Sequence, residues 1–256
     1  MAAFVEISQL GKSYPSPAGE AVIVHDFTLH VDEGEFVCLL GHSGCGKTTV
    51  LSILMGLNTP STGGVVIGGR EVAGPGTDRG VVFQSATLLP WLSVRGNVSL
   101  ALDQVRDGRG RRPETYLDAV GLAGRGEQYP RELSAGMQQR VGIARAFALE
   151  PRLLLLDGPF SLLDALTRME LQDELMALWE RTRRTVIMVT HDVDEAILLA
   201  YRIVMMTNGP AAMVGGSFDV PFPRPRRRDL LLEQADYFWL RDAILGFLEA
   251  QSHVHA

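Results

Sequence analysis

The sequence predicts an α/β fold built on a parallel β-sheet, with an inserted helical lobe. Three observations support this fold class. Short apolar runs alternate with segments of helical spacing, Leu153–Asp157 is apolar without alternation up to its last residue, and the segment between Phe83 and Pro151 is long and helical. An unbroken apolar strand is typical of a sheet covered on both faces. Alternating strands and helices favour parallel pairing.

The first third of the chain combines strands with one helix. Thr48–Gly56 has helical spacing and ends at a glycine that can form a C-cap. Alternating or continuous apolar residues predict strands, and the turn Asp32-Glu33-Gly34 separates two of them. These strands are expected at Phe4–Ser8, Val22–Val31, Glu35–Leu40, Val65–Ile67 and Val81–Phe83.

The rest of the chain is mainly helical. Asp103–Arg112 contains several arginines and two glycines, which indicates a surface linker. Asp229–Glu249 predicts one amphipathic helix or a pair. Further helices are expected at Pro113–Val120, Ser134–Ala148, Leu163–Thr182 and Val193–Ala200, and further strands at Leu153–Asp157 and Thr185–Thr190.

Composition excludes several classes of protein. The 256 residues carry a net charge of −6, which argues against a nucleic-acid binder. Two cysteines, Cys38 and Cys45, cannot form a disulfide framework. No signal peptide is recognisable, and the apolar stretch Ile197–Met206 is interrupted by Arg202. We therefore expect a cytoplasmic protein without a membrane span, whose membrane role would come through a partner.

One glycine-rich segment follows an apolar strand and opens a helix. It reads Gly41-His42-Ser43-Gly44-Cys45-Gly46-Lys47-Thr48 and is followed by Thr49. Glycines in such a loop let backbone N–H groups surround phosphate oxygens, and the helix N-terminus adds a favourable dipole. Lys47 can reach the β- and γ-phosphates, and the Thr48 hydroxyl can ligate Mg²⁺. The alternative is an ordinary glycine-rich turn.

Asp157 is a candidate metal ligand. It ends the apolar run that begins at Leu153, as a Walker B carboxylate does, and follows Lys47 by 110 residues. A carboxylate there can hold Mg²⁺ through its water shell. An aspartate at a strand end can also simply form a turn. The pairing with the glycine-rich loop favours the metal-binding role.

Further segments in this order resemble the ATP-binding cassette (ABC) ATPases over nearly the whole chain. Leu133–Arg140 is similar to the signature motif of that family, and Ser161–Asp164 resembles its D-loop. Gln84 resembles the Q-loop glutamine and His191 the switch histidine. Tyr14, 27 positions before the glycine-rich loop, resembles the aromatic that stacks on adenine. Taken alone, Tyr14 could be a surface aromatic and His191 a core histidine.

The resemblance implies a fold and a set of boundaries. It implies a P-loop NTPase (RecA-like) core with a parallel sheet, an N-terminal antiparallel β subdomain and an inserted helical signature subdomain. Residues 1–250 would form one nucleotide-binding domain. Within it, 1–83 and 151–215 would form the ATPase core with the β subdomain, 84–150 the Q-loop and helical lobe, and 216–256 a C-terminal helical tail.

The resemblance also implies roles for these residues. ATP and Mg²⁺ would be the cofactors, with Gln84 joining Thr48 and Asp157 around the metal. Gln84, Asp164 and His191 would serve hydrolysis. Ser134, an N-cap on its residue type alone, and Gly136 would contact the γ-phosphate of the nucleotide held by a second ATPase subunit, in a homodimer or heterodimer.

Partners and cargo follow from the same resemblance. Closure of two ATPase subunits would move transmembrane permease subunits docked near Leu88–Trp91, residues that could instead belong to the lobe core. The chain would sit at the cytoplasmic face of the membrane, with a periplasmic or lipoprotein anion-binding protein as indirect partner. Gly74–Arg79 and Leu88–Trp91 resemble the nitrate/sulfonate/taurine importer group. Met205–Ala212 and Val220–Arg226 are most similar to nitrate importer ATPase subunits, with nitrite, cyanate, sulfonate or taurine as alternative cargoes.

The chain departs from the family pattern at one catalytic position. Gly158 follows Asp157 where the family has the glutamate that polarises the attacking water. General-base help of this kind is worth about 10²- to 10⁴-fold. We therefore expect ATP binding with slow hydrolysis, and the alternative role is a non-hydrolytic partner of a second ATPase. Ala135 and Tyr201 are milder departures. Lys12 and the run Arg224–Arg228 are interpreted as solvated.

Overall fold

The computed structural model describes residues 3–17, 19–105 and 111–252. The chain forms two compact units, Met1–Pro75 with Ile187–Ala256 (unit 1) and Gly76–Val186 (unit 2). The middle of the predicted linker Asp103–Arg112 lies outside the described residues. The finer boundaries expected from the sequence, such as a helical lobe at 84–150, stay predictions.

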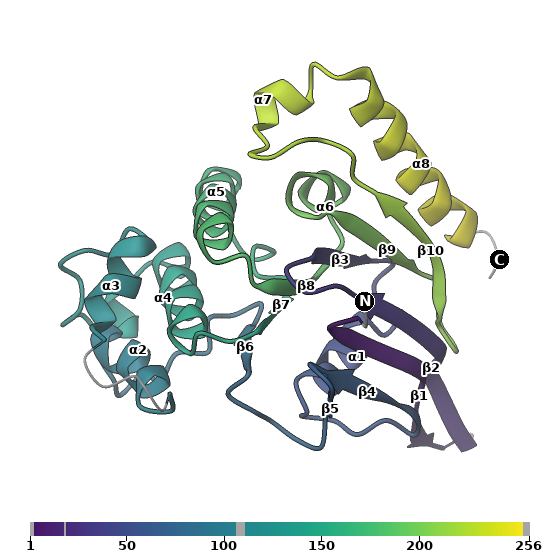
Figure 1. Ribbon diagram of the computed structural model, residues 1–256, viewed down its shortest axis with the longest axis horizontal. Helices are drawn as coiled ribbons and strands as arrows, with labels where there is room; N and C mark the ends of the chain where they lie inside the picture. Colours follow the sequence, from purple (N-terminus) through teal and green to yellow (C-terminus); the bar gives the residue numbers. More distant parts are fainter. Residues whose placement is uncertain (1–2, 18, 106–110, 253–256) are drawn as a thin grey trace. The chain divides into compact units, whose positions relative to one another are not determined.

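Unit 1 contains a four-stranded antiparallel sheet with the order β2-β1-β4-β5 (Figure 1). Alternate residues of β1, such as Val5 and Ile7, are buried, so one face of the sheet lies on the core. Strand β1 is longer than predicted and places Tyr14 on the strand. The four strands are β1 (Val5–Ser16), β2 (Gly19–Val31), β4 (Thr62–Ile67) and β5 (Arg70–Glu71).

The same unit contains parallel strands with fully buried side chains. Strand β3 (Phe36–Leu40) pairs in parallel with β9 (Arg202–Met206), and β10 (Val214–Asp219) pairs antiparallel with β9. Strand β8 (Thr185–Thr190) is the neighbour of β3 in this sheet, and its residues from Ile187 onward belong to unit 1. Arg202 Nε lies 2.7 Å from Glu35 Oε1, and this ion pair accommodates a charge at the end of an apolar strand. The parallel sheet and the antiparallel sheet confirm the predicted α/β class.

Among its described residues, unit 1 has the helices α1 (Lys47–Leu54), α6 (Val193–Leu199), α7 (Arg228–Leu231) and α8 (Ala235–Ser252). Helix α6 packs on β3 and on α8, and Figure 1 shows α8 beside α6. For Asp229–Glu249 the sequence left one helix or a pair open, and the structure has the pair α7 and α8. Tyr237 and Ile244 are among the buried residues of α8, whereas Trp239 is 72% exposed.

The prediction that Arg224–Arg228 forms a solvated face is wrong for two of its arginines. Arg226 Nη1 donates to the carbonyl oxygens of Ile197 and Ala200 at the C-terminal end of α6. The Arg224 guanidinium lies 4.5 Å from the ring centroid of Tyr201. The last carbonyl groups of a helix have no intrahelical donors, and here Arg226 provides N–H donors for them. Tyr201 is accounted for by the same contacts.

Unit 2 combines a parallel strand pair with a helical cluster. Strand β6 (Arg79–Val82) pairs in parallel with β7 (Leu153–Asp157). Helix α4 packs against α2, α3, α5 and β6. The helical elements are α2 (Val94–Leu102), α3 (Pro113–Ala119), the short 3-10 turn η1 (Pro130–Glu132), α4 (Ala135–Ala148) and α5 (Ala165–Thr182). No helix within the described residues is long and apolar enough to cross a membrane.

Candidate functional site

The glycine-rich loop joins β3 to α1 in unit 1. Gly44 and Gly46 have φ angles of +82° and +97°, which side-chain-bearing residues rarely adopt. Gly41 lies in a tight position, where a Cβ atom would stand 3.0 Å from Cys45 Sγ. Because α1 begins at Lys47, the N-terminus of this helix lies at the loop, and a helix N-terminus favours an anion.

Lys47 folds back across this loop. Its Nζ donates to the carbonyl oxygens of Gly41 and His42, at 2.7 Å each, and lies 3.5 Å from Cys45 Sγ. Only 9% of Lys47 is exposed, and Cys45 is buried. An ammonium held by two neutral carbonyls can exchange them for phosphate oxygens, which bind a cation more strongly.

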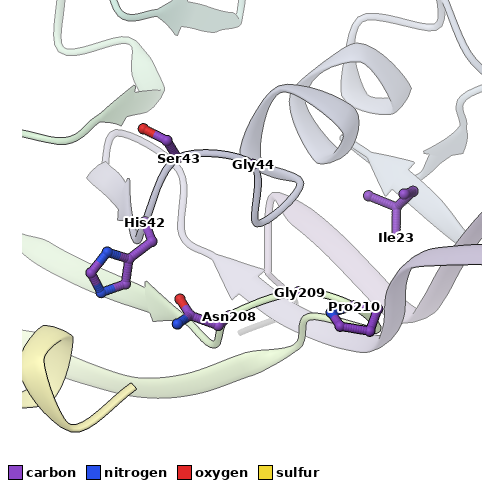
Figure 2. A pocket seen from close by; sticks show the side chains of 7 residues that line it. All are labelled: Ile23, His42, Ser43, Gly44, Asn208, Gly209 and Pro210. Atoms are coloured by element: carbon purple, nitrogen blue, oxygen red, sulfur yellow. The ribbon is translucent and has the colours of Figure 1, made fainter. Parts of the chain in front are cut away.

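A cavity of about 420 Å³ adjoins the loop (Figure 2). His42, Ser43 and Gly44 line it on one side, and Ile23 of β2 and the segment Asn208–Pro210 complete the lining. Backbone bonds from Ala211 N to Val22 O (2.9 Å) and from Ala212 N to Ile23 O (3.0 Å) hold that segment against β2. The site residues expected from the sequence did not include Ile23 or Asn208, because no local signal shows that these segments meet.

Tyr14 is held at the surface of unit 1 by two neighbours. Its hydroxyl accepts a hydrogen bond from Asn58 Nδ2 (2.5 Å), and Lys12 Nζ lies 4.8 Å from its ring centroid. Lys12 also donates to Thr59 O (2.8 Å) at the surface, so it lies near Tyr14 as expected and has a backbone partner in addition. An exposed aromatic ring of fixed orientation suits stacking on a planar base.

His191 lies between β8 and α6 and is exposed, so it is not a core histidine. Asp192 caps the following helix, where its Oδ1 accepts from Glu195 N (3.0 Å). The cap fixes the start of α6. The backbone at His191 is therefore held between a buried strand and a capped helix.

In unit 2, Asp157 ends β7 after four buried leucines. Gly158 has a φ of +53°, and a Cβ atom there would stand 2.9 Å from Ser161 Oγ. This backbone conformation therefore disfavours a glutamate at the position where the sequence has a glycine. Asp164 caps α5 by accepting from Thr167 N (3.1 Å). Hydrogen bonds from Thr167 lower the pKa of Asp164, which keeps this carboxyl ionised.

The signature segment opens α4. Ser134 is its N-cap, with Oγ accepting from Met137 N (3.3 Å), as expected from the residue type. A Cβ atom on Gly136 would lie 2.4 Å from Thr167 Cγ2, so a larger residue there would require the Thr167 side chain on α5 to move. Ala135 is exposed beside the cap.

Gln84 is exposed in the loop after β6. Two residues of α4, which the sequence did not single out, hold this loop by its backbone. Gln139 Nε2 donates to Phe83 O (2.9 Å), and Arg145 Nη2 donates to Ala86 O (3.1 Å). The helix that begins at the signature segment therefore also fixes the loop that carries Gln84.

Leu88–Trp91 follow in the same loop and differ in exposure. Trp91 is 69% exposed, whereas Leu88 and Leu89 are half-buried. Asn97, fully buried on α2, accepts from Leu89 N through its Oδ1 (2.8 Å) and donates to Leu89 O (3.2 Å). Trp91 thus stands out from a segment whose backbone is anchored, which favours docking over lobe core for this residue.

The predicted site residues fall into two groups. Unit 1 carries Tyr14, the loop Gly41–Thr48, Thr49 and His191, and unit 2 carries Gln84, Ser134, Gly136, Asp157, Gly158 and Asp164. Across the described ranges of the chain, no group of three or more His, Cys, Asp and Glu side chains could hold a metal ion by itself.

ATP-binding proteins of nitrate and bicarbonate transport are similar to this chain over most of its length. The chain is 47% identical over 98% of its length to the nitrate import ATP-binding protein NrtC of Synechococcus elongatus, and spans 39% of that protein. It is 46% identical to NrtD of the same organism, with 96% of the chain and 91% of NrtD covered. It is 47% identical to the bicarbonate transport ATP-binding protein CmpD of the same organism, with 96% and 90% covered.

A solved structure and a family model agree with these relatives. The dimeric ATP-binding cassette MJ0796, solved in a post-hydrolysis state with ADP and Pi, superposes with a TM-score of 0.74 at 31% identity, covering 86% of this chain and all of that one. The model of the family described as ABC transporter matches residues 24–161. The relatives and the matched residues show that this chain belongs to the ATPase family of the ABC transporters.

Proposed function

We propose that the chain is the ATP-binding, energy-coupling subunit of an importer for a small oxyanion, with nitrate as the first candidate. The observation that carries this proposal is the loop Gly41–Thr48 (the phosphate loop). Two of its glycines have positive φ angles, and its lysine donates hydrogen bonds to two carbonyl oxygens of the same loop. Backbone N–H groups would bind the phosphates, and the Tyr14 ring would stack on the adenine.

The residues expected around Mg²⁺ are Thr48, Gln84 and Asp157. A hydroxyl, an amide oxygen and a single carboxylate are oxygen donors of the kind Mg²⁺ prefers when phosphates complete its shell. Bound there, the ion would neutralise charge that develops on the phosphates. The exposure of Thr48 at the start of α1 is compatible with this role.

A second ATPase subunit would complete the site. In the proposed dimer, the Ser134-capped start of α4 presents N–H groups to the nucleotide held by the partner, as a helix N-terminus does to any anion. The dimeric state of the MJ0796 cassette supports this arrangement. The partner would be a second copy or a companion chain.

Transmembrane permease subunits would dock beside Trp91, whose indole is largely exposed on an anchored loop. Exposed aromatic side chains of this kind are typical of contact surfaces. The chain would then lie peripherally at the cytoplasmic face of the membrane, and an anion-binding protein on the other side would deliver the cargo.

The cargo is proposed from the relatives, which are named for nitrate and for bicarbonate at nearly equal identity. Both are small planar oxyanions, so a shared cargo class is consistent with one type of ATPase subunit. Deleting the gene in its host and measuring uptake of labelled nitrate and bicarbonate tests the proposal. Loss of nitrate uptake supports it, loss of bicarbonate uptake alone reassigns the cargo, and normal uptake of both contradicts it.

A second candidate function is favoured by Gly158. The chain could act as a nucleotide-gated partner that binds ATP while a companion ATPase hydrolyses it, since the position of the general base holds a glycine at φ +53°. Measuring ATP turnover of the chain alone and then with its companion separates the two functions. In the second, activity appears only with the companion and disappears when the companion is inactivated.

A further inference from the structure

The C-terminal helix α8 reaches the phosphate loop. Nε2 of His42 lies 2.8 Å from the carbonyl oxygen of Leu248, although 206 residues separate the two in the chain. A carbonyl can only accept, so the imidazole donates this hydrogen bond. His42 is half-buried, and its backbone carbonyl is one of the two that hold Lys47.

The same end of α8 also holds the segment that faces the loop across the cavity. Asn208 Nδ2 donates to Gln251 O (2.8 Å), and Asn208 N donates to Gln251 Oε1 (3.4 Å). His42 and Asn208 both line the cavity of Figure 2. Gln251 lies in the last turn of α8, where carbonyl groups lack intrahelical donors, so these contacts serve the helix and the site together.

Helix α8 is itself a fixed support. Tyr237 Oη and Arg241 Nε each lie 2.7 Å from Asp194 Oδ1 on α6, and Ile244 is completely buried. Phe247 contacts β10, since a Cβ atom on Gly215 would stand 2.6 Å from its ring. The carbonyl that receives the His42 hydrogen bond therefore belongs to an element packed on the rest of unit 1.

We propose that the end of α8 positions the phosphate loop, with His42 as a positioning residue whose side chain contacts α8 instead of the nucleotide. This inference rests on the proposed nucleotide-binding role. Gly44 and Gly46 make the loop conformationally free, and ordering it on binding costs entropy. An anchor at His42 removes part of that cost beforehand, which raises nucleotide affinity without any new contact.

Calorimetric titration of the full chain with MgADP tests the proposal. His42→Phe keeps a ring but removes the donor, and we expect its Kd to rise about three- to tenfold, the effect of one hydrogen bond. His42→Gln places an amide donor at nearly the reach of Nε2 and should bind within about twofold of the natural chain. His30→Phe, at an exposed histidine of β2, is the matched control.

A second pair of measurements keeps the test independent of one variant. Asn208→Ala removes the side-chain hydrogen bond from Asn208 to Gln251 O on α8, and the double variant with His42→Phe should lose less affinity than the product of the two single losses. Hydrogen exchange of amides 41–46 without nucleotide should be faster in His42→Phe, or in His42→Asn if the phenylalanine variant does not fold.

The outcomes distinguish this inference from the function beneath it. Natural affinity in His42→Phe would contradict the inference, and so would fully multiplicative losses in the double variant. Equal weakening by His42→Gln and His42→Phe would place the imidazole on the nucleotide and overturn the positioning role. A natural chain that does not bind MgADP would instead contradict the proposed function.

Discussion

Lys47 and Lys12 are the two lysines of the chain, and the structure gives each a local task. Lys12 lies over Tyr14, and Lys47 crosses the phosphate loop to reach Gly41 and His42. An ammonium fits between carbonyls or phosphates as a compact charge, whereas an arginine presents a wide planar fork. Lysine at position 47 is therefore required by the shape of the loop.

Lys47→Ala should weaken MgADP binding about ten- to a hundredfold, because a charge-assisted hydrogen bond to phosphate is lost. Lys47→Arg should not restore it. Fluorescence titration with a labelled nucleotide measures both, and Arg70→Ala on the exposed edge strand β5 is the control. Unchanged affinity in Lys47→Ala would show that the phosphates bind elsewhere.

The two cysteines should differ in reactivity. Burial, followed by the neighbouring Glu195 carboxylate, raises the pKa of the Cys38 thiol, so Cys38 should not react with a maleimide in the folded chain. Cys45 is buried inside the phosphate loop and should react slowly. Nucleotide should slow it further, and its adduct should block nucleotide binding. Mass spectrometry of labelled peptides checks this, with Cys45→Ser as control, and a rapid adduct on Cys38 would contradict it.

At the scale of elements, α4 links the signature segment to the loop of Gln84. Gln139 is 3% exposed and donates to Phe83 O, whereas its neighbour Gln138 donates to Pro130 O (2.9 Å) and Leu133 O (3.2 Å). Each glutamine therefore holds a different loop. The pair offers a matched comparison within one helix.

Gln139→Ala should speed hydrogen exchange at amides 83–87 and lower the free energy of unfolding by about 1 kcal/mol, since the part-buried carbonyl of Phe83 loses its donor. Gln138→Ala should instead speed exchange at 131–133 and leave 83–87 unchanged. Exchange mass spectrometry reads both segments at once. Faster exchange of both segments in both variants would mean that the helix unfolds as a whole.

Arg226 should be a stabilising residue of the C-terminal segment. Burial lowers the pKa of Arg226 to about 9, which leaves it protonated at neutral pH and able to donate to the carbonyls at the end of α6. Arg226→Ala should lower the free energy of unfolding by about 2–4 kcal/mol, because several buried carbonyls lose a donor. Urea denaturation measures the loss. Arg227→Ala, at an exposed residue of the same run, should change stability little, and equal losses would refute the capping role.

The elements with strong local patterns were predictable, and those defined by distant partners were not. The strand Thr185–Thr190 matches its prediction because every residue is buried and apolar or β-branched. Strand β10 contains Gly215 and Gly216 and forms because β9 lies beside it. The arginines at 224 and 226 read as a charge run, because the carbonyls that they cap are more than 20 residues away.

At the scale of the whole molecule, the sequence identified candidates for the site better than their supports. The phosphate loop carries its own signal in its glycines, since left-handed angles need them at fixed spacing. His42–Leu248, Asn208–Gln251 and Gln139–Phe83 join segments far apart in the chain. Such contacts depend on tertiary packing, which periodicity and motif spacing do not encode.

Two units carry complementary parts of the predicted nucleotide chemistry. Unit 1 has the phosphate loop, and unit 2 has the capped signature helix and the aspartate that ends β7. The binding parts agree with the family pattern. The main departure from that pattern is Gly158, where φ is +53° and the Ser161 hydroxyl lies close to where a Cβ would be.

ATP turnover at saturating MgATP, measured beside the Kd for MgATP, tests this account most directly. The natural chain should bind MgATP and turn over slowly. Gly158→Glu combined with Ser161→Ala, which removes the hydroxyl nearest the new Cβ, should bind similarly and turn over faster, by at most about 10²- to 10⁴-fold because the φ of +53° strains a side chain at this position. Ser161→Ala alone is the control and should stay slow. A natural chain that hydrolyses ATP as fast as the glutamate variant, or does not bind MgATP, would contradict the account.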